Sequence, residues 1–289
     1  MFETIEELVA LADKYGSIHE TMIVLEMEQS QYSREIIWEH MGKNLDVMMA
    51  SIKKGVNGVT SVTGLTGGDA PKLKEYIESG RYLTGKTALT AAQNAIAVNE
   101  VNAEMGLICA TPTAGSAGVA AGVLSAITDE YSLTREEQIN FLFTAGAFGL
   151  VIANNASISG AAGGCQAEIG SASAMASAAL VEYCGGTPEQ SAQAVAITIK
   201  NMMGLICDPV AGLVEVPCVK RNALGATQAF VSADMALAGI TSVIPPDEVV
   251  EAMHMVGMQM PSIFKETGEG GLAATKTGRA ITNRIFPKE

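Results

Sequence analysis

The sequence has 289 residues, enough to bury a hydrophobic core without cross-links, and a net charge of −13. Only 18 Lys and Arg residues stand against 31 Asp and Glu, and no basic run occurs, which excludes a nucleic-acid-binding surface. The first residues, MFETIEELVALADKYG, lack the basic start and apolar block of a signal peptide, so we expect a cytoplasmic protein.

The first 55 residues are predicted to form an N-terminal helical segment. Thr4–Glu7 has the pattern of a capping box, and the short helix that it starts is expected to stop at Gly16. Apolar residues recur at helical spacing from 18 to 52, and Gly55 is expected to end this longer pattern. Its methionines could form a pliable binding face, but their spacing favours core packing.

Residues 55–71, GVNGVTSVTGLTGGDAP, follow neither a helical nor a strand period. Five glycines and four Thr or Ser hydroxyl groups among these seventeen residues indicate a loop. Composition favours a plain connection between helices, and a ligand-binding loop is the alternative. The segment has neither a P-loop nor a GxGxxG motif after a strand, so no nucleotide is assigned to it.

Helical signals dominate the remainder of the chain. Residues 84–105 have a helical pattern, capping boxes begin at Thr134 and Thr187, and Pro245–Pro246 starts another helix. The tail from Thr267 is Gly-rich and is expected to be irregular. No alternating run of β-branched residues competes with these signals. The sequence therefore predicts an all-α protein.

Two uncharged stretches, residues 105–128 and 138–167, are long enough to cross a bilayer. They are rich in Gly, Ala, Ser, Asn and Thr and lack flanking basic clusters and aromatic belts, which favours buried helices of a soluble protein. No membrane association is expected. Small residues also crowd the centre of the chain, and we expect closely packed helices there, or backbone gathered around a ligand. The small-residue runs are 114–126, 159–165 and 170–179.

The five cysteines could form disulfides, bind a metal or remain as buried thiols. Disulfides are rare in a reducing compartment, so the last two alternatives stay open. Cys165, Cys207 and Cys218 each lie where regular structure is expected to break, although their spacing alone favours inert thiols over a metal site. Cys109 and Cys184 are interpreted as small apolar fillers without chemistry.

Other reactive side chains give weak signals. His19, His40 and His254 are interpreted as structural or surface residues, which argues against a Cys–His hydrolase. Lys200 or Lys220 could form an aldimine in a pyridoxal-phosphate enzyme, but neither lies in a phosphate-binding context.

Four segments carry a family resemblance: NEVNAEMGLICATPTAGSAGV, NASISGAAGGCQAEIGSASAMA, MMGLICDPVAGLVEVPCVKRNA and GEGGLAATK. Together they resemble the alpha subunit of iron-sulfur-dependent L-serine dehydratase, and the resemblance extends from about Ser61 to Lys276. It implies a lyase of serine degradation and gluconeogenesis that converts L-serine to pyruvate and ammonia. It also implies a 4Fe-4S cluster with Cys165, Cys207 and Cys218 as ligands.

The same resemblance implies a multi-helix catalytic domain over residues 56–289, continuous with residues 1–55, with Gly-rich loops around the cluster. Single-chain members of the family end in a further cysteine and carry a preceding domain with a Ser-Ser-Ser-His-Thr stretch. This sequence has neither, so we expect an iron open to substrate and a separate beta subunit in a heterodimer. A histidine of that partner is the preferred general base.

Candidate substrate contacts follow from the resemblance and from side-chain chemistry. A carboxylate of L-serine suits the hydroxyls and backbone N–H groups of the 63–69 loop. Lys276 is a further possible carboxylate partner. The alternatives are an L-cysteine desulfidase of the same scaffold and a non-catalytic helical partner protein that binds zinc. The candidate substrate-binding residues are Thr63, Thr66, Gly67, Asp69, Asn155 and Ser157.

Overall fold

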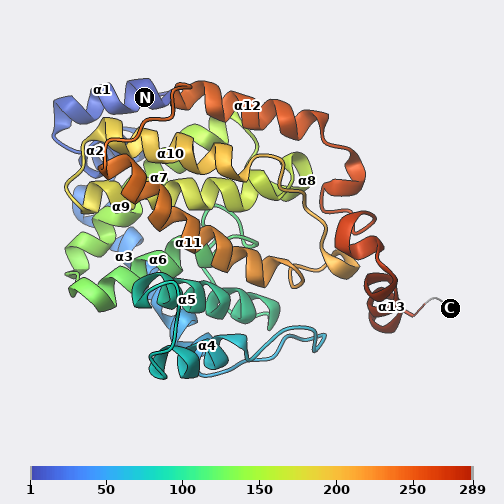
Figure 1. Cartoon of the computed structure of the whole chain (residues 1–289). Helices are drawn as coiled ribbons and strands as arrows, with labels where there is room; N and C mark the ends of the chain where they lie inside the picture. The colour runs from blue at the N-terminus through green and yellow to red at the C-terminus, as the bar shows by residue number, and fades with distance from the viewer. Residues whose placement is uncertain (1, 288–289) are drawn as a thin grey trace.

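The computed structural model describes residues 2–287, and its regular secondary structure is entirely helical, as predicted. Helices α1 and α12 lie along one edge of the molecule, α4 and α5 lie at the opposite edge, and α7, α9, α10 and α11 lie between them (Figure 1). The α-helices are α1 Ile5–Tyr15, α2 Ile18–Ser30, α3 Arg34–Val56, α4 Asp69–Glu78, α5 Lys86–Ala103, α6 Gly118–Tyr131, α7 Arg135–Asn155, α8 Gly160–Gly163, α9 Ser171–Tyr183, α10 Pro188–Met202, α11 Cys218–Leu237, α12 Pro246–Gln259 and α13 Lys276–Ile285. A π-helical turn, η1 Gln166–Gly170, and three 3-10 turns, η2 Val210–Gly212, η3 Ser262–Phe264 and η4 Gly271–Ala274, complete the set.

Helix starts agree with their sequence signals. Thr134 and Thr187 form complete capping boxes with Glu137 and Gln190. Thr4 caps α1 through the backbone N–H of Glu7, whose carboxylate accepts from Glu3 rather than completing a capping box. Pro246 is the first residue of α12, as expected.

The N-terminal segment differs from its prediction. The expected long helix is two helices, because Gln31 adopts a left-handed conformation that ends α2 before Ser33 starts α3. Gly55 does not end α3, which continues to Val56. Its lack of a side chain instead admits α5, since a Cβ there would lie 2.2 Å from the Ala97 carbonyl oxygen.

The tail also differs from its prediction. Residues 276–285 form helix α13, although an irregular segment was expected. The hydroxyl of Thr275 caps this helix by accepting from the Gly278 N–H at 3.0 Å. A local cap signal thus outweighed the glycine-rich composition.

Helix α9 occupies the centre and packs against α6, α7, α10 and α11. Residues 171–181 are all buried and consist largely of Ala and Ser. Their small side chains let four neighbours approach one helix, and two of the buried hydroxyls have backbone partners: Ser173 donates to the Gly225 carbonyl at 2.7 Å and Ser177 to the Ala174 carbonyl at 2.9 Å. The predicted close packing of small residues is confirmed.

One hydrophobic core joins the N-terminal helices to the rest of the chain. Ile37, Leu45 and Met48 of α3 belong to the same buried cluster as Val123 of α6 and Phe143 of α7. The methionines of the N-terminal segment pack on this cluster, which confirms their interpretation as core residues. Among residues 2–287, no helix combines the length and apolar character that a bilayer crossing requires.

The contact between α5 and α6 gives a stability prediction. A Cβ on Gly122 would lie 2.6 Å from the Ala91 carbonyl oxygen and 2.7 Å from the Ala95 nitrogen, so the helices would have to separate. We expect Gly122→Ala to lower the free energy of unfolding by about 1–3 kcal/mol. Gly146→Ala is the control, because the space beside Gly146 of α7 is open, and alanine is favoured over glycine in a helix by roughly 1 kcal/mol. Thermal unfolding followed by circular dichroism should separate the two variants, and equal melting temperatures would contradict the tight crossing.

Candidate metal centre and substrate site

The structure brings Cys165, Cys207 and Cys218 together from three separate segments. Cys165 immediately precedes the π-helical turn η1, and Cys218 is the first residue of α11. Cys207 lies in a short parallel bridge with Lys265, where its N–H donates to Phe264 and its carbonyl accepts from Glu266. The three thiols are close enough that Cys165 and Cys218 add to the burial that raises the pKa of Cys207.

These three cysteines are buried and unpaired with one another in disulfides. Burial raises the pKa of the Cys165 thiol to about 12, although Arg221 opposes the shift, and burial also raises the pKa of Cys218. Thiols in such surroundings hold their protons unless a metal displaces them, because the metal supplies the positive charge that the thiolate needs. Three convergent buried thiols therefore fit a metal group with sulfur ligands.

Cysteine thiolates are the ligands that iron-sulfur clusters use. Within residues 2–287, no three Cys, His, Asp or Glu side chains are placed to hold a single metal ion. In an iron-sulfur cubane each thiolate binds a different iron, so its ligands need not share one coordination sphere. The donor set of three cysteines is compatible with that group.

Arg221 is the cation at this site. Its Nη1 donates to the Ile206 carbonyl at 2.8 Å, and its Nη2 lies 2.9 Å from Oδ1 of buried Asp208. The other carboxylate oxygen of Asp208 accepts from the Leu272 N–H at 2.7 Å. A side chain on Gly271 would collide with that oxygen, so the glycine lets the C-terminal segment dock on the cysteine loop.

The 55–71 loop lies against the segment between the second and third cysteines. The hydroxyl groups of Thr63 and Thr66 donate to the two carboxylate oxygens of Glu215, at 2.7 and 2.9 Å. Glu215 is buried, so this charged acceptor holds the loop firmly in place. Both hydroxyls predicted to bind substrate are therefore engaged by the protein, and Gly67 of the same loop forms an isolated antiparallel bridge with Thr60.

Asp69 begins helix α4 and connects it to α11. Its carboxylate lies 2.7 Å from Lys220 Nζ and 2.9 Å from Lys72 Nζ, and the hydrogen bond from Lys220 lowers its pKa. Its backbone N–H donates to the buried carboxylate of Glu100 at 2.8 Å, which caps the helix start. Asp69 thus connects the end of the 55–71 loop to Lys220, which lies two residues after Cys218.

A conservative substitution of Asp69 should weaken substrate binding and leave the metal content unchanged. Asp69→Asn keeps the side-chain shape but weakens both ion pairs, and pairs with this exposure contribute roughly 0.2–1 kcal/mol. We expect the Michaelis constant for the substrate to rise about two- to fivefold at unchanged metal content. Lys72→Met is the control, because it removes the more exposed partner only. Loss of iron without a change in the Michaelis constant would assign Asp69 to the metal site instead.

Other candidate residues have different surroundings. The exposed Asn155 donates its amide to the Glu3 and Val151 carbonyls, at 2.6 and 2.9 Å, and so fastens the N-terminus to α7. Ser157 accepts from the Ser159 N–H in the turn before α8, and Lys276 is the exposed first residue of α13. None of the hydrogen bonds formed by these side chains joins them to the three buried cysteines.

The structure also shows the surroundings of the other two cysteines and of the two lysines considered for pyridoxal phosphate. Cys184 was interpreted as a small apolar filler without chemistry, but it is exposed where α9 ends and so does not fill the core. Cys109 is half-buried. Lys200 donates to the Ser242 carbonyl at 3.0 Å, and Lys220 is paired with Asp69, so both lysines proposed for pyridoxal phosphate have protein partners.

Sequence reasoning missed a polar framework beside the cysteines. Asn99 and Asn222 both donate to the Gly115 carbonyl, at 3.0 and 2.7 Å, and both accept from the Gly118 N–H at 3.1 Å. These buried amides fix the ATPTAGSAG loop at the start of α6. The quoted segments contain both asparagines, but only their burial identifies this task.

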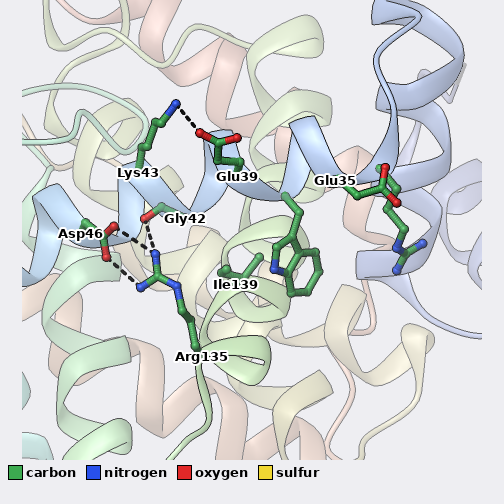
Figure 2. A pocket seen from close by; sticks show the side chains of 9 residues that line it. Glu35, Glu39, Gly42, Lys43, Asp46, Arg135 and Ile139 are labelled. Carbon is green, nitrogen blue, oxygen red and sulfur yellow. Dashed lines mark hydrogen bonds and ion pairs between the residues drawn. The ribbon is translucent and has the colours of Figure 1, made fainter.

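A groove of about 610 Å³ lies elsewhere, between α3 and the start of α7 (Figure 2). Trp38 and Ile139 are the large apolar side chains that line it. Arg135 forms a bidentate ion pair with Asp46 at 2.7 and 3.0 Å (Figure 2). Lys43 is paired with Glu39 at 2.8 Å. The three cysteines do not line this groove. Its volume therefore does not mark the place where the chemistry occurs.

The fold and these contacts define an all-helical protein with a buried three-cysteine centre beside a Gly-rich loop. The sequence profile of the family described as "Serine dehydratase alpha chain" matches residues 13–273. A protein of Bacillus subtilis named "Probable L-serine dehydratase, alpha chain" is 62% identical over 287 residues, which cover 99% of this chain and 96% of that protein. The chain belongs to the serine dehydratase alpha chain family.

Two further relatives differ in how much of their own length matches this chain. The "L-serine dehydratase, alpha chain" of Peptoniphilus asaccharolyticus is 45% identical and matches 100% of this chain and 99% of its own length. "L-serine dehydratase 1" of Escherichia coli is 35% identical over 94% of this chain but only 61% of its own length. The fold seen here therefore corresponds to one part of the longer relative.

Proposed function

We propose that this chain is the alpha subunit of an L-serine dehydratase, a lyase that converts L-serine to pyruvate and ammonia. The observation that carries the proposal is the convergence of three buried thiols in a chain matched over nearly its whole length by proteins named L-serine dehydratase, alpha chain. Removal of the α-proton and the β-hydroxyl gives aminoacrylate, which hydrolyses to the two products.

We further propose that Cys165, Cys207 and Cys218 hold a 4Fe-4S cluster. A bound cluster with an open iron supplies a Lewis acid for the departing hydroxyl group. Arg221 offsets negative charge beside Cys165, and Asp208 ties this arginine to the C-terminal segment. These contacts are expected to hold the three cysteine ligands in fixed positions.

The substrate is expected to lie between the cysteines and the 55–71 loop. Glu215 holds the hydroxyls of Thr63 and Thr66, so this loop is fixed beside the segment that carries Cys218, where a substrate carboxylate could meet its backbone N–H groups. His19 is paired with Glu182 and His40 packs edge-to-face against Tyr32, so neither of these two histidines is our candidate for the general base. We assign the base to the beta subunit and propose a heterodimer in the cytoplasm.

Anaerobic co-expression with the beta chain tests the proposal. We expect iron and acid-labile sulfide in equal amounts, a broad absorption near 400 nm that bleaches in air, and pyruvate release from L-serine with 4Fe-4S present. A colourless zinc protein would contradict the cluster. Faster pyruvate release from L-cysteine than from L-serine would instead identify a desulfidase on the same scaffold.

A further inference from the structure

Three large apolar side chains are exposed beside the 55–71 loop. Val62 is 75% exposed, Met105 is 83% exposed and Leu107 is 75% exposed. The backbone N–H of Val62 donates to the Ala103 carbonyl at 3.3 Å, which joins the loop to the end of α5. We call Val62, Met105 and Leu107 the apolar surface. Neighbouring exposed apolar residues mark an interaction surface, whereas single ones need no explanation.

Met105 has a backbone conformation that usually belongs to glycine. Its φ of 67° lies in the left-handed region, and it follows the end of α5 in a Schellman motif. In this motif the Met105 N–H donates to the Asn102 carbonyl at 3.0 Å, and the Gly106 N–H donates to the Val101 carbonyl at 2.8 Å. A side chain is strained in this conformation, whereas glycine is not. Because most of the Met105 side chain lies in solvent, packing within this chain does not offset the strain, which points to a contact with another protein.

On one side, the apolar surface continues into the loop that Glu215 holds. Val62 immediately precedes Thr63, whose hydroxyl donates to Glu215 at 2.7 Å. Glu215 is buried and lies three residues before Cys218 in the sequence. A protein that covers Val62 therefore lies beside the loop where the substrate carboxylate is expected.

On the other side, the chain runs from Leu107 to a contact with the turn that follows Cys165. Thr113 lies six residues after Leu107, and its hydroxyl donates to Oε1 of Glu168 at 2.6 Å. Glu168 is buried in η1, which begins immediately after Cys165. Two short segments thus connect the apolar surface to the elements that carry the proposed cluster ligands.

We propose that the beta chain docks on the apolar surface and presents an apolar face to it. This inference rests on the proposed function, in which the beta chain supplies the general base. That base has to reach a substrate between the cysteines and the 55–71 loop, so the beta chain has to cover the surface beside them. A second copy of this chain would not bring that base. Exposed methionine suits such an interface, because its flexible side chain packs against varied partners.

Replacing Met105 with glycine separates stability from partner binding. Met105→Gly relieves the backbone strain, so the iron-loaded alpha chain alone should melt about 1–3 °C higher. The substitution also removes the exposed side chain, so the dissociation constant for the beta chain should rise about tenfold or more. A purely structural role for Met105 would not combine higher stability with weaker binding. Thermal unfolding followed by circular dichroism and anaerobic calorimetric titration with the beta chain measure the two effects.

Gln31→Gly is the matched control, because Gln31 also follows a helix end with a left-handed φ, 59°, and lies outside the apolar surface. It should raise the melting temperature in the same way and leave the dissociation constant for the beta chain unchanged. Leu107→Ser tests the surface at an unstrained position and should weaken beta-chain binding about tenfold. At saturating beta chain, kcat for L-serine should be unchanged in Met105→Gly and Leu107→Ser.

Unchanged dissociation constants in both Met105→Gly and Leu107→Ser would overturn the docking surface, as would a failure of the unaltered chain to bind the beta chain. Light scattering checks for the other occupant. If the same substitutions convert an alpha-chain dimer to monomers at unchanged affinity for the beta chain, the surface belongs to a second copy. If binding weakens as expected but the unaltered complex releases no pyruvate from L-serine, the proposed function fails while the docking surface stands.

Discussion

Replacing any one of Cys165, Cys207 and Cys218 with serine is expected to remove most iron and sulfide from the protein and abolish turnover. A serine hydroxyl does not ionise in the pH range where metal-bound thiols do, so the substituted position cannot replace the lost sulfur ligand. Each of the three thiols is buried, and Cys165 and Cys218 lie close enough to Cys207 to raise its pKa. Iron and sulfide content after anaerobic reconstitution, together with the visible spectrum, measures the effect.

Two cysteines of the same chain serve as matched controls. Cys109→Ser and Cys184→Ser should retain iron and activity, since one thiol is half-buried in a loop and the other is exposed at the end of α9. Circular dichroism of all five variants separates metal loss from unfolding. Full iron content in any of the first three variants would show that its sulfur is not a ligand.

Turnover of L-serine by this chain alone is expected to be lower by at least about a hundredfold than turnover by the complex with the beta chain. General acid–base catalysis contributes roughly 10²–10⁴-fold, and we assign the base to the partner. Iron binding should not depend on the partner, because all three proposed ligands belong to this chain. Titrating the beta chain into iron-loaded alpha chain and recording pyruvate release gives the comparison.

The control for this experiment is a beta chain in which the histidine of its Ser-Ser-Ser-His-Thr stretch is replaced by alanine. It should restore complex formation, measured by size-exclusion chromatography, but not turnover. Equal activity of the alpha chain with and without its partner would place the base within residues of this chain. Restored activity with the altered beta chain would move the base to another residue of the partner.

The contacts that build the site connect segments far apart in the sequence. Thr63 and Glu215 are 152 residues apart, and Gly118 and Asn222 are 104 apart. Each contact joins a Gly-rich loop to an element next to a proposed cluster ligand. Substitutions in these loops can therefore alter the site without touching a cysteine.

Local structure was predictable where a few neighbouring residues determine it. The capping boxes at Thr134 and Thr187 fix helix starts through contacts three residues apart, and both are confirmed. The prediction failed at Gln31, which ends α2 in a left-handed conformation that a glutamine does not signal. It also failed at the tail, where the Thr275 cap starts a helix within a Gly-rich composition.

The sequence by itself determined the all-helical class, the small-residue core and, through motif resemblance, which three cysteines to consider. Only the tertiary structure decided that Glu215 accepts hydrogen bonds from the hydroxyls of Thr63 and Thr66, and that Thr113 donates to the buried carboxyl group of Glu168. The physical reason is the distance along the sequence between the residues that interact. Helix periodicity and caps depend on residues within one or two turns, whereas a buried carboxylate acquires its partners from whichever segments the packed helices bring beside it.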